Sequence, residues 1–124
     1  MSVAILQQGD YLIASIQSDL NDKQVLELRE ELADLVGKRR VRGIVIDVAA
    51  LDVIDSFVAR SLRSIVQTAK LRGAETVIVG IQPDVAIAMV QFHLNLEPLR
   101  VALDLDAAIT LLDRLTRRAA EDGG

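Results

Sequence analysis

The sequence predicts a single α/β domain built on a mostly parallel sheet, with an antiparallel strand at one edge. Short β-branched runs alternate with longer segments in which apolar residues recur every three or four positions. Two runs, GIVIDV over 43–48 and TVIVGI over 76–81, are almost wholly apolar, as in strands buried on both faces of a sheet. The 124 residues, 51% of them hydrophobic, suffice for one core but not for two domains.

The chain begins with an expected hairpin followed by a helix. Val3–Leu6 and Tyr11–Ile16 are short apolar runs, and the residues QQGD over 7–10 between them favour a turn, so two antiparallel strands are expected. Asn21 stands in the position of a helix N-cap. The apolar face of the helix then runs as far as Gly37 through Val25, Leu28, Leu32, Leu35 and Val36.

The middle of the chain predicts two further strand–helix pairs. After the strand over 43–48, a helix is expected to begin at Asp55 and Ser56 and to end at Gly73. After the strand over 76–81, Pro83 and Asp84 suit the first turn of a third helix. The core face expected for that helix consists of Val85, Ala88, Met89 and Phe92.

A last strand over Pro98–Leu103 and a last amphipathic helix, from Leu105 to Arg117 and Arg118, complete the pattern. The predicted order is β-β-α-β-α-β-α-β-α, with residues 1–118 as the domain and 119–124 as a polar C-terminal tail.

Composition excludes several classes of function. A net charge of −4 argues against a nucleic-acid surface, and the one basic cluster, over 38–42, follows an acidic helix start, which indicates a helix end. The absence of cysteine excludes disulfides and thiolate chemistry. No stretch reaches the length of a membrane span and no signal peptide is recognisable, so a soluble cytoplasmic protein without membrane contact is expected.

The sequence contains no recognisable motif for catalysis or for binding a cofactor. Neither GxxxxGK[ST] nor GxGxxG occurs, His93 is the one histidine, and no cofactor or metal site is expected. Asp47 ends a strand, as in phospho-accepting receiver domains, but their acidic pair and lysine are missing, so we expect Asp47 to bond loop amides around 49–53. Asp52 and Asp55 could pair for acid–base work, although a solvated loop is the better interpretation.

Ser56 is the most informative residue, because it stands where a helix begins. Unpaired amides and the helix dipole favour negative charge there, so a phosphoserine would be tolerated. The alternative is a plain N-cap, a role that Asp55 could share. Phe57 falls off the apolar stripe of its helix, so it either packs under the preceding loop or is exposed at a protein-binding surface.

The segment IVIDVAALDVIDSFVARSL, over 44–62, resembles the signature of STAS domains, the anti-sigma factor antagonist fold, in which a strand ending in Asp leads to Asp-Ser at a helix start. The expected element order agrees with that fold over the whole chain. The motifs DSF over 55–57, AR over 59–60 and GIQP over 80–83 are similar to the stressosome branch. Sporulation-type antagonists carry a small residue and then Gly after the serine, and this chain has Phe57 and Val58 instead.

This resemblance implies a non-catalytic phosphoprotein of stress signalling. Its partners would be a longer STAS paralogue with an N-terminal sensory domain, a switch serine kinase that phosphorylates Ser56, and a phosphatase of the PP2C type. A homo-oligomer and a large hetero-assembly are also implied. Asp52, Asp55, Phe57 and Arg60 would contact partners. Two alternatives stay open: a small nucleotide-binding α/β module, and an antagonist that binds an anti-sigma factor one to one.

Overall fold

The computed structural model describes residues 3–94, 96 and 98–123, with 118–123 described by their backbone only. One sheet has the strand order β1-β2-β3-β4-β5. The strands are β1 (Val3–Gln8), β2 (Tyr11–Ile16), β3 (Gly43–Asp47), β4 (Glu75–Val79) and β5 (Arg100–Ala102). β1 pairs antiparallel with β2, and every other pair is parallel. The predicted fold class and element order are confirmed.

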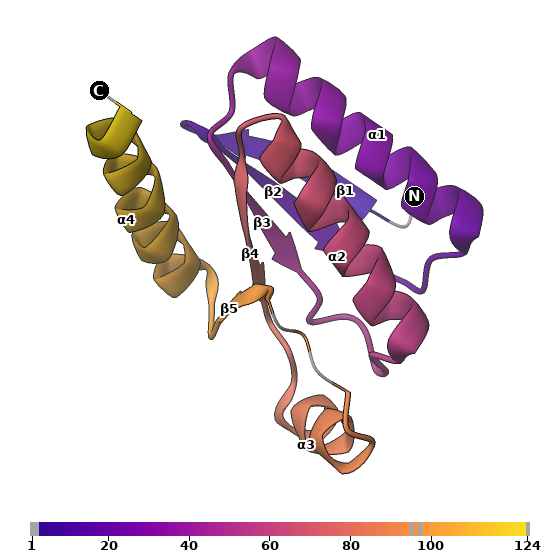
Figure 1. Cartoon of the computed structure of the whole chain (residues 1–124). Helices are drawn as coiled ribbons and strands as arrows, with labels where there is room; N and C mark the ends of the chain where they lie inside the picture. The colour runs from indigo at the N-terminus through magenta and orange to yellow at the C-terminus, as the bar shows by residue number, and fades with distance from the viewer. Residues whose placement is uncertain (1–2, 95, 97, 124) are drawn as a thin grey trace.

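Helices cover both faces of this sheet (Figure 1). They are α1 (Asp22–Arg39), α2 (Ser56–Leu71), α3 (Pro83–Gln91) and α4 (Leu105–Gly123). On one face, α1 and α2 pack over strand residues such as Leu12, Ile44 and Ile78. On the other, α4 packs over the alternate residues Ile13 and Val45. Helix α3 lies beyond the carboxyl end of β4, so it is placed beside the loops rather than on the sheet.

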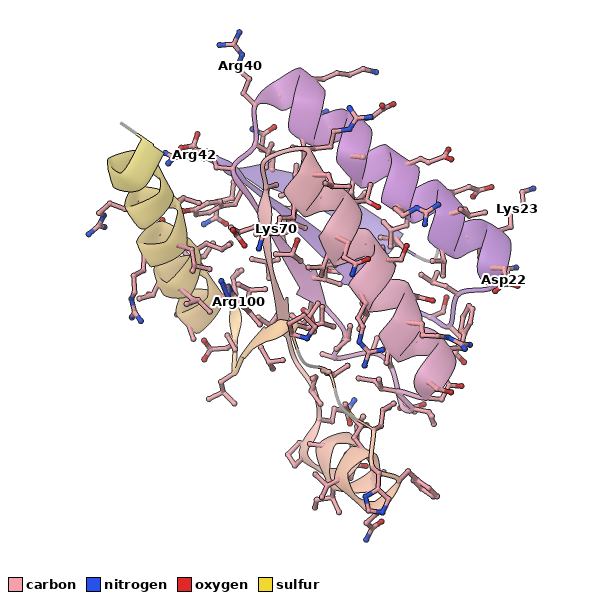
Figure 2. All side chains as sticks on the ribbon, in the orientation of Figure 1. Asp22, Lys23, Arg40, Arg42, Lys70 and Arg100 are labelled. Atoms are coloured by element: carbon pink, nitrogen blue, oxygen red, sulfur yellow. The ribbon has the colours of Figure 1, made fainter. Side chains whose placement is uncertain are left out.

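Helix α4 is held against the sheet by polar contacts around Tyr11. The Tyr11 hydroxyl donates a hydrogen bond to the Asp113 carboxylate, and the Arg42 guanidinium donates to the carbonyl oxygen of Thr116 over 2.9 Å. Figure 2 shows Arg42 beside α4, at the end of the molecule away from α3. A Cβ atom on Gly43 would lie 2.8 Å from the Tyr11 ring, so close packing of α4 requires glycine there.

Helix α1 begins where the sequence predicts, but it ends later than predicted. Asn21 is the N-cap, as predicted, and it forms a capping box with Gln24. The helix does not end at Gly37 but continues to Arg39, because Arg40 adopts a left-handed conformation (φ 51°) and its amide donates to the carbonyl of Val36. Lys38 and Arg39 occupy the last turn, so the interpretation of the basic cluster as a helix end is confirmed.

The prediction that Phe92 belongs to the core face of the third helix is wrong. Helix α3 ends at Gln91, and His93 takes a positive φ of 55°. The amide of Leu94 then donates to the carbonyl of Met89 over 2.8 Å, which closes the helix in a Schellman turn. The Phe92 side chain is left 81% exposed.

The last strand is shorter than Pro98–Leu103. The amide of Leu99 donates to the carbonyl of Leu96 over 2.7 Å, so the chain turns before β5 begins at Arg100. Helix α4 extends to Gly123, into the segment for which the sequence predicts a polar tail; Gly124 lies outside the described residues.

Candidate functional site

The loop between β3 and α2 is fixed to the body of the domain. Val48, Leu51 and Ile54 point into the core and are almost fully buried, whereas the residues between them are exposed. The amide of Val48 donates to the carbonyl of Val79 on β4 over 3.0 Å, and the amide of Leu51 donates to that of Val48. The backbone that carries the exposed residues of this loop is therefore well fixed.

Asp47, Gly80 and Gln82 connect this loop with the one after β4. The amide of Ala49 donates to the Asp47 carboxylate over 2.9 Å, which confirms the expected structural role of Asp47. The Gln82 side-chain amide donates to the carbonyl of Ala49 over 2.5 Å. Gly80 has a φ of 84°, and a Cβ atom there would lie 2.6 Å from the Asp47 carboxylate. The loop contact accordingly requires glycine at this position.

Asp55 caps helix α2, and Ser56 is its first helical residue. The amide of Val58 donates to the Asp55 carboxylate over 3.0 Å. The plain-cap alternative for Ser56 is therefore wrong, because the carboxylate of its neighbour performs that task. The Ser56 hydroxyl is exposed and has no hydrogen-bond partner within the part of the chain that the structure describes. The amides of Ser56 and Phe57 belong to the first turn, which lacks intrahelical carbonyl partners.

Ser56 borders a groove of about 610 Å³ between this loop and α3, here called the serine groove. Asp52 and Asp55 contribute to it from the loop side and Asp84 from the start of α3. Its apolar lining includes Ile54, Val85, Ala88, Met89 and Phe92. Ile87 and Val90, which are 60% and 75% exposed, extend the apolar surface of α3 into solvent. A hydroxyl, three carboxylates and an apolar helix are thus gathered at one end of the domain.

Phe57 faces a different groove. Its side chain is partly buried and lines a hollow of about 230 Å³ together with Leu20 and Leu51, between the start of α2 and the start of α1. Phe57 is therefore neither fully packed under the preceding loop nor fully exposed, and its contact with a partner stays a prediction. Asp55 borders both grooves.

The predicted site residues are only partly brought together. Asp52, Asp55 and Ser56 share the serine groove, Phe57 lies in the neighbouring one, and Arg60 is exposed one turn after Ser56. No ion pair of Arg60 occurs in the described ranges. Asp52 and Asp55 are both exposed, and Asp55 is occupied as a cap, which agrees with a solvated loop rather than an acid–base pair.

The sequence did not identify the contribution of α3. One signal was available: Ile87 and Val90 lie off the stripe of Val85 and Met89, so the helix carries more apolar residues than its core face uses. Among residues whose side chains are described, no cluster of His, Cys, Asp and Glu could hold a metal ion. No described helix combines the length and the apolar character needed to cross a membrane.

The chain is similar in sequence and in structure to proteins of one family. The model of the STAS domain matches residues 2–108. A structure of Moorella thermoacetica RsbS with a serine-to-glutamate substitution is 37% identical, with a TM-score of 0.75, over 94% of this chain and 99% of that one. A structure described as the molecular architecture of the stressosome, a signal integration and transduction hub, is 38% identical, with a TM-score of 0.74, over 92% of this chain and 99% of that one.

Among curated proteins, the RsbT co-antagonist protein RsbRC of Bacillus subtilis is 29% identical over 91 residues, which are 73% of this chain and 32% of RsbRC. The chain thus spans about a third of the length of this relative.

Proposed function

The chain belongs to the STAS domain family, and from this premise we propose that it is a non-catalytic antagonist of stress signalling that holds a switch serine kinase until Ser56 is phosphorylated. The likeness to RsbS and to a stressosome structure, each more than 90% covered on both sides, supports the stress-signalling branch of the family. The single observation that carries the kinase switch is the unoccupied, exposed hydroxyl of Ser56 at the mouth of α2.

The separation of the cap from the serine supports Ser56 as the acceptor. Since Asp55 satisfies the amide of Val58, modification of Ser56 leaves the cap in place. A phosphate at the first helical position gains from the amides of the first turn and from the helix dipole. Arg60 lies four residues on, which places it on the same side of the helix, so its positive charge would offset part of the added negative charge.

The serine groove suits a partner surface that combines apolar and basic side chains. Met89 and Phe92 offer apolar contacts, and Asp52 and Asp84 offer negative charge beside them. Phosphorylation would add a charge of about −1.5 to −2 next to these carboxylates. That charge would lose hydration on docking and raise the density of negative charge in the groove. Release of the kinase follows from both effects.

The wider assembly is part of the same proposal. We propose that the chain co-assembles with a longer STAS paralogue that carries an N-terminal sensory domain, and that a PP2C-type phosphatase restores Ser56. The match to one third of RsbRC supports a partner of that kind. Residues 1–118 would act as the single domain, with 119–124 as a polar segment at its end.

Intact-mass measurement after incubation with the switch kinase and ATP tests the proposal. One added phosphate is expected on the wild type and on Ser61→Ala, and none on Ser56→Ala. Ser61 is a matched control because it lies on the same helix and its hydroxyl donates to the carbonyl of Phe57 over 2.7 Å. An unmodified wild type, with a kinase that is active on another substrate, would refute the phosphorylation step.

Kinase binding is the second readout. Ser56→Asp is expected to weaken it in calorimetric titration, whereas Ser56→Ala is expected to preserve it. Equal affinity for the wild type and Ser56→Asp would refute the release mechanism.

A further inference from the structure

A second concave site lies beside the serine groove, and the proposed kinase switch does not depend on it. It is the hollow of about 230 Å³ that Phe57 lines, here called the Phe57 hollow. Its walls come from the loop between β2 and α1, the loop between β3 and α2, and the first turns of α2. It lies at the carboxyl end of β2, and open α/β sheets commonly bind ligands at the carboxyl ends of their strands.

The floor of the Phe57 hollow is apolar and belongs to the core of the domain. Its almost fully buried residues are Ile16, Leu51, Leu62 and Ile65, and the partly buried Leu20 forms part of the wall. An apolar cavity of about 150 Å³ in a protein core is large enough to hold benzene. The Phe57 hollow therefore has room for one small apolar body, such as an aromatic ring or a branched alkyl group.

Every described polar side chain that lines the Phe57 hollow offers a hydrogen-bond acceptor. Asp19 and Asp55 are exposed carboxylates at its rim. Asp19 has no hydrogen bond or ion pair within the described part of the chain, and Asp55 uses one oxygen for the amide of Val58. The Ser61 hydroxyl donates its proton to the carbonyl of Phe57 over 2.7 Å, so its oxygen can only accept a further bond. A polar group of a ligand in this hollow must therefore be a donor.

The charges around the Phe57 hollow favour a cation. None of the described residues that line it is basic. Lys23, the basic residue nearest to Asp19 along the chain, has its Nζ atom 3.9 Å from the carboxylate of Glu27 on its own helix. An ammonium group would supply three donors and place a positive charge beside two carboxylates, whereas a carboxylate or phosphate would meet like charge.

We propose that the Phe57 hollow binds a small monocation with an apolar body, of the class of the arylalkylamines. Its apolar group lies on the floor of the hollow and its ammonium group lies at Asp19 and Asp55. This site goes beyond the proposed kinase switch and does not rest on it, because neither Ser56 nor α3 lines the hollow. The tests use the full chain without a kinase, so their failure would leave the phosphorylation proposal unaffected.

Benzylamine, which is protonated at neutral pH, is the probe for this class of ligand. In a titration followed by methyl signals in NMR spectra, the signals of Leu20 and Leu51 are expected to shift and to saturate. The expected dissociation constant is about 1 mM, because so small a molecule makes few contacts. The methyl signals of Leu112, which is buried under α4 on the other face of the sheet, should stay unchanged.

Two results of this titration would overturn the site. One is the absence of saturation up to about 20 mM benzylamine. The other is a shift of the Met89 methyl signal, in the serine groove, that exceeds those of Leu20 and Leu51.

The role of the carboxylates is tested with an uncharged ligand and with charge variants. Benzyl alcohol has the same ring without the charge, and it should bind about threefold more weakly or worse. Asp19→Asn and Asp55→Asn should each raise the dissociation constant for benzylamine about two- to fivefold, and added salt should weaken binding to the wild type. Asparagine is also a good N-cap, so Asp55→Asn removes the charge and keeps the start of α2.

Asp52→Asn is the matched control. Asp52 is an exposed carboxylate of the same loop as Asp55, but it does not line the Phe57 hollow, so its variant should bind benzylamine as the wild type does. Equal affinity for benzylamine and benzyl alcohol, or equal effects of the Asp19, Asp55 and Asp52 variants, would overturn the proposal.

Discussion

The amide of Val58 donates a hydrogen bond of 3.0 Å to the carboxylate of Asp55, so the cap of α2 lies one residue before Ser56. Two adjacent polar residues thus have different tasks, and stability measurements should separate them. Asp55→Ala is expected to lower the free energy of unfolding by about 1 kcal/mol, because it leaves a first-turn amide unsatisfied. Ser56→Ala should change it by less than about 0.5 kcal/mol.

Urea denaturation followed by circular dichroism measures both effects. Asp52→Ala is the matched control, since Asp52 is an exposed loop carboxylate that does not cap a helix. If Ser56→Ala were the more destabilising of the two helix-start variants, the assignment of the cap to Asp55 would be wrong.

Gly80→Ala should disturb the support of the serine groove. The substitution adds backbone strain at a φ of 84° and brings a Cβ atom within 2.6 Å of the Asp47 carboxylate, which bonds Ala49. We expect a loss of about 2–3 kcal/mol in the free energy of unfolding.

Gly73→Ala provides the comparison for Gly80→Ala. Gly73 also has a positive φ, 95°, but a Cβ atom there would meet no described atom within 4 Å. Gly73→Ala should therefore lower the free energy of unfolding only through backbone strain, by about 1–2 kcal/mol. Equal losses in the two variants would show that the contact with Asp47 contributes nothing.

The exposed side chain of Phe92 should matter for kinase binding and not for folding. Phe92→Ala removes apolar surface from the rim of the serine groove, and we expect the dissociation constant for the switch kinase to rise about tenfold or more. Leu71→Ala is the control, because Leu71 is 88% exposed at the far end of α2. Calorimetric titration gives the affinities, and equal binding by both variants would exclude the α3 surface from the interface.

Tyr11 should make stability depend on alkaline pH. Burial, together with the hydrogen bond to Asp113, raises the pKa of Tyr11 above 10.0, so the folded protein holds the phenol proton more tightly than the unfolded chain. The resulting stabilisation is complete below pH 10 and is lost as the pH rises through the raised pKa.

Since Tyr11 is the one tyrosine, phenolate absorbance reports its titration directly. Urea denaturation across the same pH range should show a wild-type loss of stability that is smaller in Tyr11→Phe. A Tyr11 midpoint at or below pH 10, or the same pH dependence in both proteins, would contradict the effect.

Most of the fold follows from local patterns in the sequence. The apolar runs over 43–48 and 76–81 predict the central strands, and Asn21 predicts the start of α1. Three details were decided by longer-range or backbone effects. Arg40 and His93 adopt left-handed conformations that end helices where spacing by itself does not, and Pro98 lies in a turn rather than in β5.

The sequence predicts the site residues that are neighbours in the chain, but not those that tertiary packing brings to the same groove. Asp55 and Ser56 are recognisable at a helix start because cap residues have local signatures. Their neighbours from α3, Asp84 and Phe92, reach the same groove through the packing of the two loops, in which Gln82 bonds Ala49. Sequence spacing carries no information on such a contact.

The buried anchors of the β3–α2 loop have a consequence for molecular recognition. Because Val48, Leu51 and Ile54 already fix the backbone beside Ser56, little conformational entropy remains to be lost when a partner docks. If Ser56 is phosphorylated as proposed, the kinase would meet an exposed serine on a backbone that is already fixed, so a rigid-body encounter is expected. Phosphorylation would then signal through a change in the charge of this surface, without a change in its conformation.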